Sequence, residues 1–355
     1  MRQGAWRSRF SYSNRPGRMR RCGASNGVSA TNSFVLKTVK LQTSAAGRMR
    51  PFFYIYDRNE DTLAVAEAEA CVLADGEVVG HGVVEGKARI ACAETGFMRA
   101  GAELLARGRT LEKLVGCIRE RGLSADRYRI VAEPIPRTVG GDHRAIRAVA
   151  ACIEGPADLR NPTEEFLLVV SSGGFWFGRL IPKGCDRWRE FDRRPRPFCN
   201  AAPLRLVRAA IGLSTQPGDR VHDPCCGSGT IPFLAWTMGR RAYGTDRSWP
   251  AVAMARENLA HFGCPVTIGH ADARATDYQS DCIITNPPYD LYCPTNESTV
   301  PGMLASFRSA APRVTVITAM DLAPLVTELG YTVERAIPVR RHDFERTLYI
   351  MRSPE

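Results

Sequence analysis

The sequence contains no run of apolar residues long enough to cross a lipid bilayer, which argues against a membrane protein. Its twelve cysteines include no Cys-x-x-Cys pair and its six histidines are scattered, so no metal site is indicated. Cys71, Cys152 and Cys282 lie in apolar segments, as is typical of buried free thiols in a reducing compartment, and the cytoplasm is the expected location. A length of 355 residues without a visible repeat predicts two or three domains.

Residues 1–50 contain no acidic residue, although they carry eleven Lys and Arg. The remaining 37 basic residues equal the 37 acidic ones, so the net charge of +11 belongs to this segment. A basic tail rich in Arg, Ser, Gly and Asn, assigned to residues 1–49, is predicted to be disordered. It is interpreted as an RNA-contacting arm, as an organellar transit peptide, or as a segment that precedes the true start at Met49.

The glycine-rich sequence Val221–Thr230 (VHDPCCGSGT) lacks the Gly-Lys-Ser/Thr of a phosphate loop and the third glycine of a dinucleotide fingerprint. Arg220–His222 predicts the end of a buried strand, which Asp223-Pro224 terminates. Gly227 and Gly229 then give a turn without side chains, before a helix that begins at Thr230. Alone, the motif indicates no more than a strand-to-helix turn. Followed by further strands, it predicts a nucleotide-binding α/β sheet.

Two acidic residues follow the next predicted strands. The strand Arg241–Thr245 ends in Asp246, about twenty residues after the glycines, where a carboxylate suits a ribose diol. After a predicted helix over Ala251–Phe262, the strand Pro265–Ile268 is followed by Asp272, which can accept a hydrogen bond from an adenine amino group. Because ligands bind outside the carboxyl ends of such strands, these side chains are expected at one edge of the sheet.

A fourth predicted strand, Asp281–Thr285, runs directly into Asn286-Pro287-Pro288-Tyr289, 63 residues after Asp223. The Asn286 side-chain oxygen and the Pro287 carbonyl can each accept an N–H of an exocyclic amino group. That favours a pyramidal nitrogen whose lone pair is free to attack. The two prolines restrict the loop, and Tyr289 offers a ring face to an extruded base.

These motifs resemble those of the class I S-adenosylmethionine-dependent methyltransferases, and within them the amino-methylating group. The resemblance implies a Rossmann-like, mostly parallel sheet and S-adenosylmethionine as cofactor. It implies cofactor contacts from the glycine loop and from the two strand-end acids, namely Asp223, Cys226, Gly227, Gly229, Asp246 and Asp272. The target base would be held by Asn286, Pro287, Pro288 and Tyr289.

The N-terminal half resembles that of the THUMP-domain tRNA guanine-N2 methyltransferases. The sequence from His143 to Ile181 is similar to the second half of a THUMP domain, with a turn at Gly173-Gly174, and Phe52–Tyr56 would be the first strand of a preceding α+β ferredoxin-like region. The expected organisation after the tail is a ferredoxin-like region (50–122), a THUMP-like RNA-binding region (123–184), a linker (185–201) and the methyltransferase domain (202–355). The implied substrate is tRNA or another structured RNA, methylated at N2 of a guanosine.

Outside the motifs, the linker interleaves arginines with aromatic residues, so it is either an RNA contact or a solvated connection; the arginines concerned are Arg187, Arg193, Arg194 and Arg196. The apolar spacing of Ala100–Arg121 predicts one helix, and Tyr331–Pro338 with Phe344–Met351 predicts an antiparallel strand pair. Asp290 stands where the resembled enzymes usually have glycine. Two alternatives remain open: an adenine-N6 methyltransferase of DNA or RNA, and an inactive RNA-binding protein that keeps the fold.

Overall fold

A computed structural model of the chain describes residues 51–135, 143–198, 200–288, 299–341 and 344–354. The basic tail 1–49, Tyr289 and Asp290 lie outside the described residues, so what was expected of them stays a prediction. Within the described part, no helix combines the length and the apolar character that a membrane span requires.

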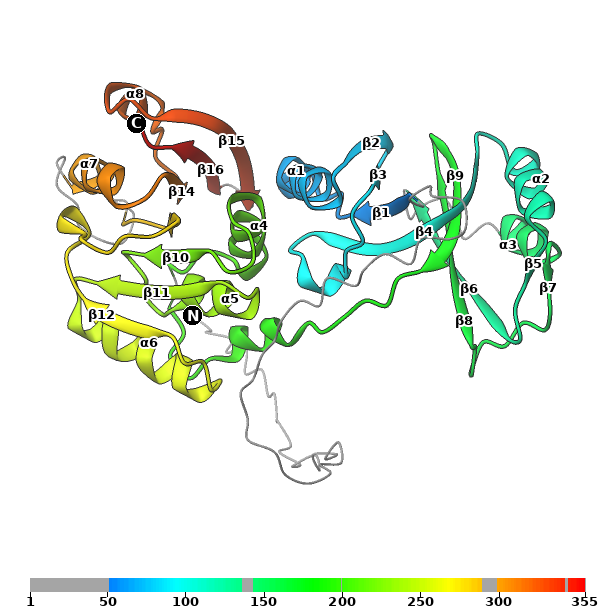
Figure 1. Cartoon of the computed structure of the whole chain (residues 1–355), viewed down its shortest axis with the longest axis horizontal. Coiled ribbons are helices and arrows are strands. Elements are labelled where there is room, and N and C mark those ends of the chain that lie inside the picture. The colour runs from blue at the N-terminus through cyan, green and yellow to red at the C-terminus, as the bar shows by residue number, and fades with distance from the viewer. Residues whose placement is uncertain (1–50, 136–142, 199, 289–298, 342–343, 355) are drawn as a thin grey trace, which may run out of the picture. The chain divides into compact units, whose positions relative to one another are not determined.

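In the described N-terminal half, seven strands form one mixed sheet in the order β2-β3-β1-β4-β9-β8-β6 (Figure 1). Its strands are β1 (Phe52–Tyr56), β2 (Gly76–Gly80), β3 (Val83–Gly86), β4 (Met98–Gly108), β6 (Tyr128–Ile135), β8 (Glu164–Ser171) and β9 (Gly174–Leu180). The helices of this half are α1 (Leu63–Ala74), α2 (Leu111–Arg121) and α3 (His143–Ala150), and a short parallel pair joins β5 (Leu123–Ser124) to β7 (Ile153–Glu154). Strands from both expected N-terminal regions enter this one sheet, so their separation near residue 122 stays a prediction.

The single helix predicted over Ala100–Arg121 is wrong. Its first half is strand β4, which pairs antiparallel with β1 on one side and β9 on the other, and only its second half is helix α2. Thr110 separates the two elements, because its side chain accepts the Lys113 backbone N–H and caps the helix. The apolar residues of β4 follow helical spacing by coincidence, and pairing with two neighbouring strands overrides it.

The C-terminal half contains a second sheet, in the order β12-β11-β10-β13-β14-β16-β15 among the described residues (Figure 1). Its strands are β10 (Arg220–Asp223), β11 (Arg241–Asp246), β12 (Thr267–His270), β13 (Cys282–Thr285), β14 (Arg313–Thr318), β15 (Thr332–Arg341) and β16 (Phe344–Arg352). The first five are parallel, and β16 runs antiparallel to both β14 and β15. The predicted fold class, a mostly parallel doubly wound α/β sheet after an α+β region, is confirmed.

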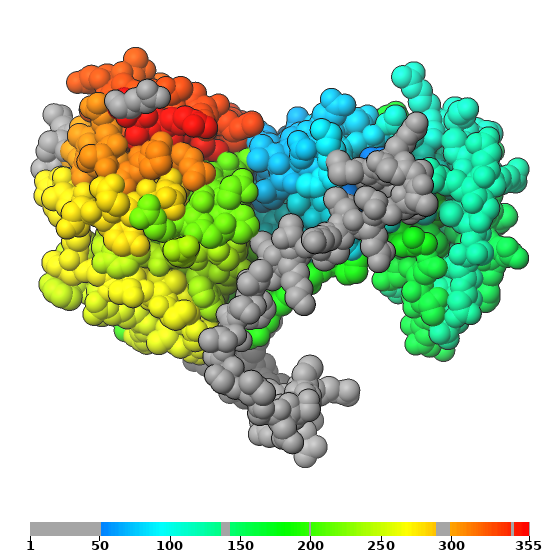
Figure 2. Space-filling model, in the orientation of Figure 1, coloured from blue at the N-terminus to red at the C-terminus, as the bar shows by residue number. Residues whose placement is uncertain are grey.

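Helices cover both faces of this second sheet, as the alternating side chains of its strands require. Ile284 and Ile350 pack on one face with α4 (Leu204–Ser214), α5 (Thr230–Thr237) and α6 (Trp249–His261). Ile283 and Met351 pack on the opposite face with α7 (Thr299–Ala310) and α8 (Ala323–Glu328). The space-filling view shows the outer surface of this half, continuous from the yellow residues of α6 to the orange and red C-terminal residues (Figure 2). A core on both faces leaves the strand ends as the place for a ligand.

Candidate active site

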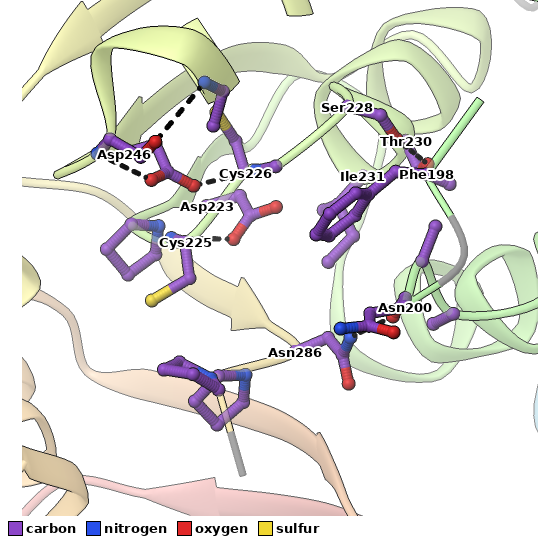
Figure 3. A pocket seen from close by; sticks show the side chains of 18 of the residues that line it. Phe198, Asn200, Asp223, Cys225, Cys226, Ser228, Thr230, Ile231, Asp246 and Asn286 are labelled. Carbon is purple, nitrogen blue, oxygen red and sulfur yellow. Dashed lines mark hydrogen bonds between the residues drawn. The ribbon is translucent and has the colours of Figure 1, made fainter. Parts of the chain in front are cut away.

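A cavity of about 900 Å³ lies at the carboxyl ends of β10, β11 and β13 (Figure 3). Most of the residues singled out from the sequence line it, namely Asp223, Cys226, Gly227, Asp246, Asn286, Pro287, Pro288 and Arg196. The strands that carry them are neighbours in the sheet, which explains how motifs 63 residues apart meet. Gly229 and Asp272 do not line the cavity, and Tyr289 lies outside the described residues.

The glycine loop approaches the cavity with its backbone. Gly227 and Gly229 have φ angles of 50° and 85°, in the left-handed region that favours glycine. A Cβ added to Gly227 would meet nothing closer than the ring of Phe198, 3.5 Å away, so the space beside the loop is open to a ligand. Gly229 instead starts α5, and its N–H donates to the carbonyl of Cys226 at 2.8 Å.

Asp246, at the end of β11, holds the glycine loop in place. One carboxylate oxygen accepts the backbone N–H of Gly227 at 2.9 Å, and the other accepts the N–H of Ser248 at the same distance. A carboxylate oxygen can accept more than one hydrogen bond. Asp246 can therefore order the loop and still bind the two hydroxyls of a ribose, which is the role predicted for it.

Asp223, at the end of β10, is buried beneath the cavity. Its Oδ1 accepts the Thr285 hydroxyl at 2.9 Å and the Cys225 backbone N–H at 3.1 Å. Burial raises the pKa of Asp223 to about 7, although these two hydrogen bonds act to lower it, because the charged form loses its hydration. The Asp223 carboxyl thus joins the end of β10 to the end of β13.

Asp223→Asn is expected to change how stability depends on pH. The folded-state pKa of Asp223 lies above the unfolded value of roughly 4, so the wild-type protein takes up a proton on folding between these values. The contribution of Asp223 to the free energy of unfolding is therefore lost as pH rises from about 4 to 7, at up to about 1.4 kcal/mol per pH unit. The variant lacks this term, so its free energy of unfolding relative to wild type should increase over that window. Urea titrations at several pH values measure it, and parallel curves for the two proteins would contradict it.

Asn286 is fixed in orientation at the end of β13. Its Nδ2 donates to the backbone carbonyl of Asn200 at 3.1 Å (Figure 3), whereas its Oδ1 is buried and has no hydrogen-bond partner among the described residues. A buried amide oxygen without a donor is costly in the absence of a ligand. This arrangement leaves an acceptor for an N–H of a bound target, as the sequence motif predicts.

The segment before α4, expected to be a linker, is anchored to the glycine loop. Asn258 of α6, fully buried, accepts the backbone N–H of Arg196 at 2.8 Å and donates to the carbonyls of Arg196 and Ser228. Earlier in the segment, Phe191 is buried and stacks on Phe233 with ring centroids 4.2 Å apart. A solvated connection does not describe these residues.

The four arginines predicted to bind RNA occupy different environments. Arg196 lines the cavity and approaches Glu257 at 3.2 Å. Arg194 is half-buried, donates to the Phe191 carbonyl and has a pKa lowered by burial, so it belongs to the packing of the segment. Arg187 and Arg193 are exposed, the former 3.8 Å from Glu190. Their contact with RNA stays a prediction.

Asp272 points its carboxylate at Arg274, which lies two residues later. The shortest of these contacts is 2.6 Å, and the Arg274 side-chain hydrogen bond lowers the pKa of Asp272 to about 2. Its neighbour Ala273 lines the cavity instead. The adenine contact expected of Asp272 therefore stays a prediction that would require the Arg274 pair to rearrange.

Several lining residues have no motif in the sequence. Phe198 and Asn200 precede α4, Met254 lies on α6, and Phe344 and Arg346 begin β16. The guanidinium of Arg346 lies 4.3 Å from the ring centroid of Phe344. Phe344 and Arg346 share one signal, an aromatic and a basic residue at the start of a strand, whereas Asn200 and Met254 have none in their residue type.

Comparison with known proteins gives a family match for part of the chain. Residues 193–316 match the family described as RMKL-like, methyltransferase domain. The chain is 30% identical over 184 residues to a tRNA (guanine(10)-N2)-dimethyltransferase of Methanothermobacter thermautotrophicus, an alignment that covers 50% of this chain and 52% of that protein. It is 33% identical over 125 residues to the protein of the same name from Pyrococcus abyssi, covering 32% of this chain and 37% of that one.

The chain thus spans about half the length of the first relative and less of the second. Among solved structures, TrmN from Thermus thermophilus is similar with a TM-score of 0.48 and 20% identity, over 86% of this chain and 100% of that chain.

Proposed function

We propose that this chain, whose residues 193–316 form a methyltransferase domain of the RMKL-like type, transfers a methyl group from S-adenosylmethionine to N2 of a guanosine in tRNA. The observation that carries the proposal concerns Asn286. Its side-chain oxygen has no hydrogen-bond partner in the described part of the chain, and Asn286 lines the same cavity as Asp246 and the glycine loop. We place the enzyme in the cytoplasm, because nine cysteines of the described residues are free thiols.

The cavity fits S-adenosylmethionine together with a base. Its volume of about 900 Å³ is at the upper end of small-molecule sites, enough for more than one group. Asp246 offers acceptors for the ribose, the bare backbone of Gly227 allows close approach, and Pro250 and Met254 add apolar surface. The cofactor supplies an electrophilic methyl group on a sulfonium; the remaining chemistry belongs to the protein.

The protein's part of the reaction is to orient the amino nitrogen and hold its protons. The lone pair of an exocyclic guanine nitrogen is delocalised into the ring, so it attacks poorly. Asn286 Oδ1 accepts one N–H, and we expect the Pro287 carbonyl to accept the other, which directs the lone pair at the methyl group. Because Asn200 and the prolines fix this loop, little entropy is lost on reaching the attack geometry.

Charge around the cavity supports a nucleic-acid substrate. Among the described lining residues, two are aspartates and four are arginines, namely Arg196, Arg247, Arg341 and Arg346. One of those aspartates, Asp223, has a pKa raised by burial, so the positive charge is only partly offset. Arginines that line a nucleotide-sized cavity can bind the phosphates on either side of a target nucleotide.

The choice of guanosine and tRNA rests on the names of the two archaeal relatives and on the N-terminal half, in which we propose that residues 123–184 act as a THUMP-like RNA-binding region. Incubation of the purified protein with bulk tRNA and labelled cofactor, followed by nucleoside mass spectrometry, tests the proposal. N2-methylguanosine is expected. N6-methyladenosine would support the adenine alternative, and no labelled nucleoside would support an inactive binding protein.

Phe344→Ala is expected to weaken substrate binding without affecting the cofactor. The ring lies in the cavity wall beside Arg346, and loss of one aromatic face for stacking on a base costs about 1–3 kcal/mol, a 5- to 150-fold rise in KM for tRNA. Phe344→Tyr keeps the ring face and serves as the matched control. Equal KM values for wild type and the alanine variant would remove Phe344 from the substrate side of the cavity.

A further inference from the structure

A second cavity, of about 650 Å³, is lined by none of the described residues that line the proposed methyl-transfer site and is strongly basic. Among the described residues that line it, one is acidic, Asp57, whereas five are basic: Arg58, Arg99, Lys183, Arg189 and Arg205. These side chains come from the N-terminal sheet, from the segment before α4 and from α4 itself. Like charges that come from separate segments repel one another, so a negatively charged ligand would stabilise this cluster.

The carboxylates near the cavity offset these charges only in part. Asp57 is committed to Arg205 at 2.7 Å, and Glu133 is committed to Arg99 at 2.9 Å. Asp186 is shared, at 3.9 Å from Lys183 and 3.6 Å from Arg189. In the ion pairs of the described residues, these five cations thus share three carboxylates, and two of the cations compete for one of them.

Arg58 has no ion pair among the described residues. Its Nε is buried and has no hydrogen-bond partner there. A buried guanidinium donor without an acceptor costs free energy, which an anionic ligand would recover. Arg58 lies directly after β1, and the neighbouring Asp57 is paired with Arg205. The charge of Arg58 is therefore available to an anion that binds in the cavity.

The two cavities are adjacent along the chain. Ala202 lines the first and Arg205 the second, so three residues, at most about 10 Å of backbone, connect their walls. Met98, Pro134 and Ile135 give the second cavity an apolar wall, which suits a sugar or a base attached to an anion. This spacing places part of the wall of the second cavity within about 10 Å of the wall of the first, which is within reach of one or two nucleotides of a bound strand.

We propose that this second cavity binds a phosphodiester group of the RNA substrate, near the nucleotide that is methylated. One guanidinium group can donate two N–H bonds to two oxygens of the same phosphate, and arginines supply four of the five basic groups among the described residues of this cavity. The inference rests on the proposed function and deepens it, because it names the group by which the RNA is positioned.

The test is the double variant Arg58→Gln, Lys183→Gln. Neither change leaves a carboxylate without a partner, because Arg58 has no ion pair among the described residues and Asp186 keeps Arg189. The matched control is the double variant Arg241→Gln, Arg119→Gln, which removes the same charge from exposed sites at the start of β11 and the end of α2. Binding of bulk tRNA is measured at several salt concentrations, with melting temperature and S-adenosylmethionine affinity as checks on folding.

The cavity variant is expected to bind tRNA about tenfold more weakly at 0.15 M salt. The slope of the logarithm of its tRNA binding constant against the logarithm of salt concentration should be smaller in magnitude by about 1 to 2, whereas the control keeps the slope of the wild type. Its KM for tRNA should rise with kcat unchanged. Equal slopes in the wild type and the cavity variant would show that the cavity contacts no phosphate of the RNA and would overturn the proposal. Calorimetry with inorganic phosphate separates RNA phosphate from a free anion. If the wild type binds phosphate saturably, the cavity variant does not, and the two proteins have the same salt dependence of tRNA binding, then the cavity binds a free anion and the proposal is overturned.

Failure of the proposed function gives a different result. In that case wild-type protein yields no labelled N2-methylguanosine from tRNA, whichever way the slopes compare. A wild type that methylates tRNA and a cavity variant with the slope of the wild type would reject the second cavity alone.

Discussion

Asn286→Ala should lower the turnover number for methyl transfer by about 100-fold or more and leave S-adenosylmethionine affinity nearly unchanged. The Asn286 oxygen is the acceptor that the cavity presents without a partner among the described residues, and it lies at the end of β13, away from Asp246 on β11. Its hydrogen bond to the target strengthens as the nitrogen becomes pyramidal, so the loss falls on the transition state. Single-turnover rates with saturating tRNA and cofactor measure the effect, and calorimetry measures cofactor affinity.

Asn286→Asp separates the acceptor from the contact that orients it. The carboxylate keeps an oxygen for the target, but its second oxygen faces the Asn200 carbonyl in place of an N–H donor. Its rate should therefore fall between those of wild type and the alanine variant. Full activity in Asn286→Ala would show that this loop does not carry the reaction.

The strands that carry the site could be predicted closely from the sequence, because β10, β11 and β13 are short segments that run directly into a polar residue or a turn. The strand predicted at Arg241–Thr245 is β11, one residue longer, and the helix predicted from Thr230 begins there. Asp246 and Asn286 were located because parallel strands bring their carboxyl ends to one edge. Local pattern and fold agree at these positions.

What the sequence did not predict depends on contacts between distant segments. Asn200 orients Asn286 through its backbone carbonyl, which carries no signature in the residue type. Phe344 reaches the cavity only because β16 pairs with β14 in the antiparallel direction, which brings its N-terminal end to the carboxyl edge of the parallel strands. Asp272 was placed at the correct strand end, but the sequence does not show that Arg274 would take its carboxylate.

The cofactor side of the site depends most on Asp246, and Asp246→Ala should raise the dissociation constant for S-adenosylmethionine about 30-fold, or about 2 kcal/mol. Two effects combine. The ribose loses its charged acceptor, and the glycine loop loses the bond from Gly227 N–H that holds it in the bound shape. Calorimetric titration without RNA, at a temperature where both proteins remain folded, measures the change.

Asp246→Asn tests whether the site needs the charge and both acceptor oxygens of the carboxylate, because asparagine keeps the size of the side chain. Both Asp246 oxygens already accept backbone N–H groups, from Gly227 and Ser248, so an amide would have to point its NH2 group at one of these donors. The asparagine variant should therefore bind the cofactor as weakly as the alanine variant. Asp281→Asn, which removes a carboxylate paired with Arg220 at the start of β13, is the matched control and should keep the affinity of the wild type. If Asp246→Ala also kept it, the carboxylate would order the loop without touching the ribose, and the cofactor's sugar would have to be bound elsewhere in the cavity.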